Sequence, residues 1–237
     1  MGQPHPLLDH IRAIEEASSA PALLQATRAL ADLISNTAPK GEVPWDPGDL
    51  EAAIACLVQV LGFNNPGAAV AAVDGLINLG PMAVDPLLAR LDPRNYGARA
   101  WAVRALAGIG DVRGLTLLEE ALATDVGPSV RRAAAHGLGR LQLASVEPDE
   151  RQDIRARALA SLVAGCGDGE WVVRYAVAVG LESLVEAMEP LPQERQQALE
   201  ALEALALPER EETPVVRLRA AFAQRRLLGS PAIPICP

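Results

Sequence analysis

The chain repeats one pattern of apolar and small side chains five times along its length. In each twelve-residue copy, positions 1, 5, 8, 9 and 12 are mostly apolar or small, with Leu usually at position nine and Arg usually at position two. This spacing places the apolar positions on one face of an α-helix, and the small ones allow a neighbouring helix to approach closely. The five predicted helices span residues 68–79, 98–109, 130–141, 173–184 and 216–227.

A second amphipathic helix precedes each copy, and Gly or Pro marks most of the joints. These helices are expected over residues 50–61, 82–91, 115–123, 151–164 and 193–206. The ninth positions of successive copies lie between 30 and 43 residues apart, which is typical of two-helix repeats. A single helix pair cannot bury its apolar face, whereas stacked pairs can. The pattern therefore predicts an all-α protein, an α-solenoid of HEAT-like two-helix repeats.

We expect this solenoid to form a single domain over residues 1–237. Residues 7–35 are interpreted as a degenerate N-terminal repeat, 36–49 as a loop rich in Pro and Gly, 50–228 as five repeats and 229–237 as a loose C-terminal tail. In the fifth copy Gln224 replaces the core Leu and two Arg residues follow it. The C-terminal repeat is therefore expected to act as a cap with a wetter outer face.

Composition supports helices and excludes several classes of function. Half of the 237 residues are hydrophobic but only 3% are aromatic, so the apolar mass is Ala, Leu and Val. The sequence contains no run of eighteen apolar residues, so no membrane span is predicted. No secretory signal is recognised either. The net charge of −9 opposes binding to nucleic acid. Three dispersed Cys and three His predict neither a disulfide framework nor a metal site, and a reducing compartment fits them.

An Arg recurs at position two of four copies, as Arg99, Arg131, Arg174 and Arg217. We interpret this row as structural, with each Arg pairing with an Asp of a neighbouring turn. Asp111 and Asp168 are placed for such pairing, and Arg binds carboxylates through two parallel hydrogen bonds.

Positions 3, 4, 7 and 11 of each copy lie off the core face and carry the candidate chemistry. The second helices of two-helix solenoids usually line the concave surface, so these positions are expected in a shallow trough. Among them are Asp74, Trp101, Arg104, Arg132, His136, Arg140 and Tyr175, with Tyr96 and Trp171 at the edge. Aromatic rings and guanidinium groups suit a flat, conjugated ligand that carries carboxylates. The same residues are enriched in grooves that bind proteins, and composition alone favours the protein groove.

Recognised catalytic motifs are not found in the sequence. It contains no GxSxG, no P-loop, no GxGxxG between a strand and a helix, and no HExxH. Asp74, Arg104, Arg132 and His136 remain as groups that can transfer protons.

Four strings resemble one family closely. They are GFNNPGAAVAAVDGLINLG (62–80), NYGARAWAVRALAGIGD (95–111), SVRRAAAHGLGRL (129–141) and GEWVVRYAVAVGLE (169–182). They resemble the E/F-type phycobilin lyases, and most closely the F-type subunit of the phycocyanin α-chain lyase. The resemblance covers roughly residues 50–184, and more loosely from residue 7. A general HEAT-like repeat would supply the Ala and Leu of these strings but not NYGARAW or GEWVVRY.

The resemblance implies a lyase subunit that works as a heterodimer with an E-type partner in the cytoplasm of cyanobacteria, during phycobilisome assembly. The pair would hold a linear tetrapyrrole, phycocyanobilin or phycoerythrobilin, as a substrate and not a cofactor. It would attach this bilin by a thioether to a cysteine of the phycocyanin α chain, so the reacting thiolate belongs to the client. The alternative is a non-catalytic HEAT-repeat adaptor or chaperone for the apo-phycobiliprotein or the bilin.

The resemblance indicates motif positions, and we assign roles to individual residues among them as a hypothesis. Asp74 is the candidate acid. The positions expected to contact the bilin or client are Tyr96, Trp101, Arg104, Arg132, Trp171 and Tyr175, and His136 of the trough completes the set. Relatives that also isomerise the bilin carry a His-Cys pair. Cys56 has no His beside it and lies on an apolar helix face, so it is expected in the core and isomerisation is not expected.

Overall fold

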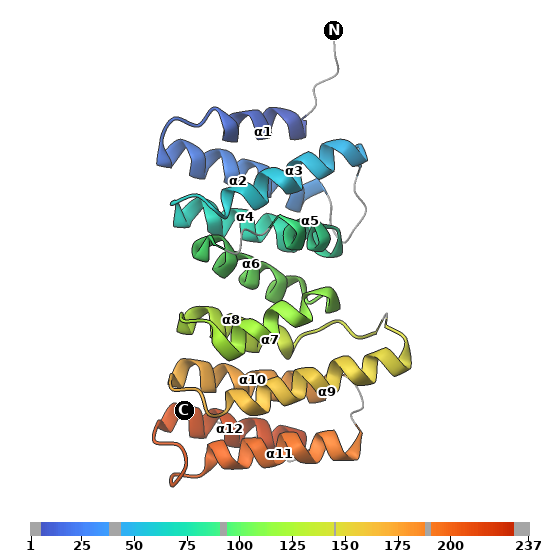
Figure 1. Ribbon diagram of the computed structural model, residues 1–237, viewed down its shortest axis with the longest axis vertical. Helices are drawn as coiled ribbons and strands as arrows, with labels where there is room; N and C mark the ends of the chain where they lie inside the picture. The colour runs from blue at the N-terminus through green and yellow to red at the C-terminus, as the bar shows by residue number, and fades with distance from the viewer. Residues whose placement is uncertain (1–5, 38–43, 91–93, 145, 188–190, 230–237) are drawn as a thin grey trace, which may run out of the picture. The chain divides into compact units, whose positions relative to one another are not determined.

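The computed structural model describes residues 6–37, 44–90, 94–144, 146–187 and 191–229, and these are almost entirely helical (Figure 1). Within them the chain forms twelve α-helices and two short 3₁₀ turns. The first six helices are α1 (Pro6–Glu15), α2 (Ala20–Thr37), α3 (Pro47–Val60), α4 (Pro66–Leu79), α5 (Val84–Ala89) and α6 (Tyr96–Ile109). The others are α7 (Leu115–Thr124), α8 (Pro128–Leu138), α9 (Pro148–Gly165), α10 (Trp171–Glu186), α11 (Pro192–Ala206) and α12 (Pro214–Leu227). The 3₁₀ turns are Gly80–Ala83 and Val112–Gly114.

The helix starts follow from local sequence. Pro stands in the first turn of α3, α4, α8, α9, α11 and α12, where its missing N–H costs no hydrogen bond. Asn65 and Asn95 cap α4 and α6, because their side-chain oxygens accept the backbone N–H groups of Ala68 and Ala98 at 3.1 and 3.0 Å. The amide nitrogen of Asn65 also donates to the carbonyl of Ala20 at 2.8 Å. One side chain thus starts α4 and ties it to the beginning of α2.

The helices form two compact units, residues 1–114 and 115–237. In the first unit α1, α3 and α5 pack in sequence as one layer, and α2, α4 and α6 form the other. In the second unit the two layers are α7, α9 and α11, and α8, α10 and α12. The predicted class of fold is confirmed: the six helix pairs are the five repeats and the degenerate N-terminal one. The expectation of a single domain stays a prediction.

Three predicted boundaries are wrong. The helix expected over 82–91 is a 3₁₀ turn followed by the short α5, because Gly80 has a φ of 62° and Pro81 and Pro86 both lack a backbone donor. The helix expected over 130–141 ends at Leu138, and Gly139 and Arg140 form a turn. The loop expected over 36–49 is shorter, since α2 runs to Thr37 and α3 begins at Pro47. Residues 38–43 of that loop and the tail from 230 lie outside the described residues.

The core of each unit lies between its two layers. The ninth position of the first four copies, Leu76, Leu106, Leu138 and Leu181, is fully buried. Gly180 allows α8 and α10 to approach closely: a Cβ built on it would lie 2.6 Å from the carbonyl oxygen of Ala135 and 2.9 Å from a methyl of Leu162. The small residues of the pattern therefore decide how closely the helices pack.

We expect Gly180→Ala to destabilise the protein by about 1 kcal/mol. Ala gains roughly 1 kcal/mol over Gly in helix propensity. Overpacking costs about 1–3 kcal/mol and exceeds this gain here, because the clash is with the backbone carbonyl of Ala135, which cannot rotate away. Urea unfolding followed by circular dichroism measures the difference. Gly169→Ala is the matched control, because no atom lies within 4 Å of its added Cβ. Equal stability of the two variants would contradict the expectation.

Candidate functional site

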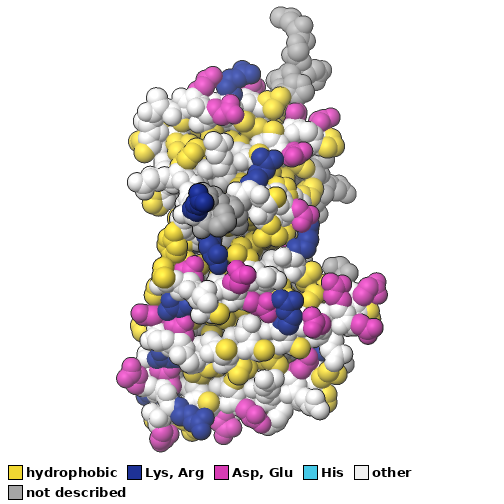
Figure 2. Space-filling model, viewed as in Figure 1, with side chains coloured by type: hydrophobic (Ala, Val, Ile, Leu, Met, Phe, Trp, Pro, Cys, Tyr) yellow, Lys and Arg dark blue, Asp and Glu magenta, His cyan; other side chains and the backbone are white. Residues whose placement is uncertain are grey.

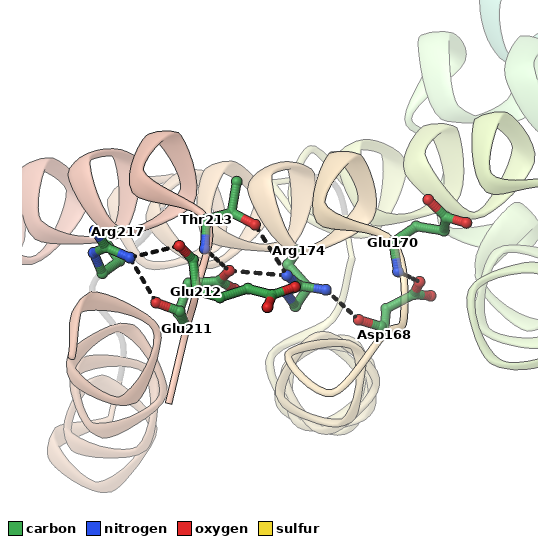
Figure 3. Close-up of polar contacts among 7 residues, drawn as sticks. All are labelled: Asp168, Glu170, Arg174, Glu211, Glu212, Thr213 and Arg217. Atoms are coloured by element: carbon green, nitrogen blue, oxygen red, sulfur yellow. Dashed lines mark hydrogen bonds and ion pairs between the residues drawn. The ribbon is translucent and has the colours of Figure 1, made fainter. Parts of the chain in front are cut away.

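The row of Arg residues at position two is a structural ladder in the second unit, and Figure 3 shows Arg174 and Arg217 of this row with their partners. Arg131 binds both carboxylate oxygens of Asp168, with Nε–Oδ2 and Nη2–Oδ1 distances of 2.6 and 3.0 Å. Arg174 binds Glu211 in the same way, at 2.5 and 2.8 Å. The expected pairing is confirmed for Arg131, whereas the partner of Arg174 is a Glu. Asp111 does not join the ladder through Arg131 or Arg174, because it is bound by Arg113.

The acidic partners occupy equivalent places in successive loops. Asp125, Asp168 and Glu211 are spaced 43 residues apart, and each accepts the backbone N–H two residues further on, at 2.9, 2.9 and 2.7 Å. The Nη1 groups of Arg131 and Arg174 each donate to the carbonyl of the residue six positions earlier, at 2.8 Å. Both guanidinium groups are thereby occupied inside the fold. These Arg residues orient the second helices and are not ligand-binding candidates.

In the first unit the structure brings Trp101 and Arg104 together on α6. The guanidinium carbon of Arg104 lies 5.8 Å from the centre of the Trp101 ring, within cation–π range. Arg104 is exposed and Trp101 is half-buried, while Tyr96 at the start of α6 is 47% exposed. One turn of helix thus presents an aromatic face and a cation side by side.

Asp74 lies in a groove between α2 and α4, with a volume of about 370 Å³. Across the groove α2 contributes Arg28, Asp32 and Ser35. Asp74, Arg28 and Asp32 are exposed, and no hydrogen bond or ion pair occupies them among the described residues. At one end the amide of Asn78 donates to Ser35 Oγ at 2.5 Å and joins the two helices. The groove therefore offers two carboxylates and one guanidinium to a ligand.

Sequence reasoning found Asp74 but missed the α2 side of this groove. The pattern of the five copies does not extend to the degenerate N-terminal repeat, so it predicts Asp74 as the candidate acid and predicts no candidate on α2. The signal was present, because Arg28 and Asp32 are one turn apart on a face of α2 opposite to the buried Leu30 and Ile34.

The second unit carries the remaining candidates on α8 and α10. Arg132 is exposed, His136 and Tyr175 are half-buried, and Trp171 at the start of α10 is 47% exposed. Burial lowers the pKa of His136, and the positive charges of Arg140, Arg132 and Arg219 lower it further. His136 is therefore neutral at pH 7 and offers a hydrogen bond, not a charge.

One part of the predicted trough is wrong. Position four was expected to be off the core face, yet Ala71 is 6% exposed and Ala176 is fully buried. This position faces the preceding second helix: Ala71 borders the groove against α2, and Ala176 lies one turn before Gly180, which touches α8. Trp101 is the position-four residue of α6, which explains its half-buried state.

Two cysteines of the described chain are protonated thiols. Cys56 is 7% exposed, so its expected place in the core is confirmed. Burial, with a smaller contribution from Glu15, raises the pKa of Cys56 to about 11, and burial raises the pKa of Cys166 to about 12. Over the residues that the structure describes, no three His, Cys, Asp or Glu side chains are grouped to hold a metal ion.

One described stretch, residues 66–89, is long and apolar enough to cross a membrane by length and composition. More than half of its most apolar window, 56%, is buried inside the fold, and the 3₁₀ turn Gly80–Ala83 interrupts it. The core helix of a folded domain passes the same test, so this is weak evidence for a span.

The two-layered stacks of helix pairs define a HEAT-repeat protein of the helical solenoid class, and the family model for HEAT repeats matches residues 54–139. Comparison with known proteins then gives the family. The chain is 44% identical over 225 residues to the bilin biosynthesis protein RpcF of Synechococcus sp. (strain WH8020), covering 95% of this chain and 98% of that protein. It is 50% identical to the phycocyanin alpha phycocyanobilin lyase CpcF of Synechocystis sp. (strain PCC 6803), covering 74% of this chain and 75% of that one.

A solved structure agrees with these relatives. A chain in the complex of CpcE and CpcF of phycocyanin lyase from Nostoc sp. PCC7120 superposes with a TM-score of 0.66 at 43% identity, over 73% of this chain and 98% of that one. The protein belongs to the E/F-type phycobilin lyase family, among the F-type, or β, subunits.

Proposed function

We propose that this chain is the F-type subunit of a heterodimeric phycobilin lyase. With an E-type partner it binds a linear tetrapyrrole, phycocyanobilin or phycoerythrobilin, and attaches it by a thioether to a cysteine of the phycocyanin α chain. The observation that carries this proposal is the identity of 44% over nearly the whole chain with a bilin biosynthesis protein. We place the reaction in the cyanobacterial cytoplasm, where phycobilisomes are assembled.

The reaction does not require a covalent bond between the lyase and the bilin. The client's S–H adds across a carbon–carbon double bond of the bilin: a C–S bond forms, the proton ends on the bilin, and nothing leaves. No oxidant is needed, so the bilin is the substrate and no cofactor takes part. What the lyase supplies is orientation of the two reactants and a proton at the right place.

The described residues fit these tasks. Asp74 is exposed in its groove, where a carboxyl group can exchange a proton with a pyrrole nitrogen. The rings of Tyr96, Trp101, Trp171 and Tyr175 offer stacking area, while Arg104 and Arg132 offer exposed guanidinium groups to carboxylates. His136, being neutral, suits a hydrogen bond to the bilin.

Colour provides the test. Co-expression with an E-type partner, the phycocyanin α chain and a source of phycocyanobilin is expected to give a coloured α chain that survives a denaturing gel. Mass spectrometry of the client then reports the modified cysteine and the bilin together. The matched control omits this chain alone. If the control yields as much adduct, the chain is a non-catalytic adaptor or chaperone for the apo-phycobiliprotein or the bilin.

A further inference from the structure

The layer of second helices in the second unit continues from α8 and α10 onto α12, the helix that the sequence marked as a cap. The positions equivalent to the trough residues of α8 and α10 are Leu218, Arg219, Phe222 and Arg226. Leu218 is 71% exposed and Phe222 is 41% exposed, although α10 and α12 pack side by side. The fifth repeat therefore extends the exposed aromatic and cationic surface.

Phe222 is held between two guanidinium groups. The guanidinium carbons of Arg219 and Arg226 lie 5.5 and 5.9 Å from the centre of its ring. Glu182 of α10, only 3% exposed, fixes both: it forms an ion pair with Arg219, and its Oε1 lies 3.2 Å from Nε of Arg226. Arg226 also binds Glu186 at 2.8 Å. A buried carboxylate thus lies beside the two cations that flank this exposed ring.

The α8 side of the surface carries positive charge on two exposed Arg side chains. Arg132 and Arg140 are exposed, and neither guanidinium group forms a hydrogen bond or ion pair among the described residues. Both lie near His136, whose pKa they lower together with Arg219. On α10, Glu182 and Glu186 form ion pairs with Arg219 and Arg226 of α12. Two free guanidinium groups are notable in a chain with a net charge of −9.

We propose that this surface, formed by Arg132, Arg140, Tyr175, Val179 and Phe222, binds the two carboxylate side chains of the bilin and the rings that bear them. This assignment rests on the proposed function. A linear tetrapyrrole is a flat, conjugated dicarboxylate, so its rings match the strip of Tyr175, Val179 and Phe222. Its carboxylates match the free charges of Arg132 and Arg140. Charge complementarity is the reason for choosing this occupant over an uncharged one.

The test compares phycocyanobilin as the free diacid with its dimethyl ester, both titrated into the complex of this chain with its E-type partner and followed by absorbance. The wild-type complex is expected to bind the diacid at least about tenfold more tightly than the ester. The Arg132→Gln/Arg140→Gln variant is expected to lose this preference, with binding of the ester unchanged. Phe222→Ala is expected to weaken both forms equally, because stacking does not depend on the carboxylates.

Arg157→Gln on α9 is the matched control, because Arg157 is exposed but pairs with Glu119 away from this surface. It is expected to keep the preference for the diacid. Equal affinity of the wild-type complex for diacid and ester would overturn this inference and leave the proposed function standing. Binding of neither form would overturn the proposed function itself. If the double variant bound both forms normally but lost the phycocyanin α chain, the surface would belong to the client, and the inference would be wrong.

Discussion

Replacing Arg174 by Gln is expected to destabilise the protein by about 3–5 kcal/mol, because it leaves a buried carboxylate without its cation. The Glu211 side chain is 1% exposed, and Arg174 supplies it with two hydrogen bonds at 2.5 and 2.8 Å. Arg174 also donates to the carbonyl of Asp168, so the change releases two neighbouring loops. Urea unfolding of the purified variant measures the loss.

Two further variants test whether the loss of stability comes from the unpaired buried charge or only from the loss of an ion pair. Arg174→Met with Glu211→Leu is expected to recover most of the stability, since the buried charge is removed together with its partner. Arg90→Gln breaks an exposed pair with Glu51 and is expected to cost less than about 1 kcal/mol. A double variant as unstable as Arg174→Gln would show that the ladder does not act through this charge.

The same pair predicts a pH dependence. Hydrogen bonds from Arg174 hold the pKa of Glu211 below its ordinary value of 4.5, in spite of burial. A lowered folded-state pKa adds stability that is fully present above pH 4.5 and is lost as the pH falls through the folded value. The wild-type protein is therefore expected to lose stability on acidification more steeply than Arg174→Gln. The difference in the free energy of unfolding between the wild-type protein and Arg174→Gln should become smaller below pH 4.5.

Asp74→Asn is expected to slow bilin transfer about 100-fold or more while bilin affinity changes little, because a positioned proton donor contributes about 10²–10⁴-fold to a rate. Asn keeps the size and hydrogen-bonding capacity of the side chain but cannot exchange a proton. Transfer is measured as the rate of adduct formation under single-turnover conditions, and affinity by titration without the client.

The matched control for this prediction is Asp32→Asn, on the other side of the same groove. It removes one negative charge from the groove, as Asp74→Asn does. It therefore tests whether the loss of charge alone slows bilin transfer. Equal losses of rate and affinity in Asp74→Asn would exclude the acid role. If Asp32→Asn slowed bilin transfer and Asp74→Asn did not, the acid role would belong to Asp32.

Much of the fold was predictable because helical periodicity is a local signal. The small and apolar positions located the second helices, and Leu76 and Leu181 are buried as expected. The pattern failed where neighbouring helices decide the outcome. Ala176 is fully buried although the pattern places it off the core face, and the exposed Phe222 of α12 was not predicted as a candidate because Gln224 marks that repeat as a cap.

The candidate site was predictable only in part for the same reason. Asp74 and Arg132 lie on exposed helix faces, as the phase of the pattern required. Asp32 and Phe222 become candidates only when the packing of α2 against α4 and of α10 against α12 is known. The acidic partner of Arg174 was not predicted either, because the pattern led to an expected Asp and the equivalent loop position holds Glu211.

The raised pKa values of Cys56 and Cys166 protect the protein from reacting with the electrophilic bilin through its own thiols. With pKa values of about 11 and 12, fewer than about one in a thousand of these thiols is a reactive thiolate at pH 7. A carrier with a nucleophilic sulfur of its own would label itself and keep its cargo. Burial keeps these two thiols protonated, so they do not compete with the client's cysteine for the bilin.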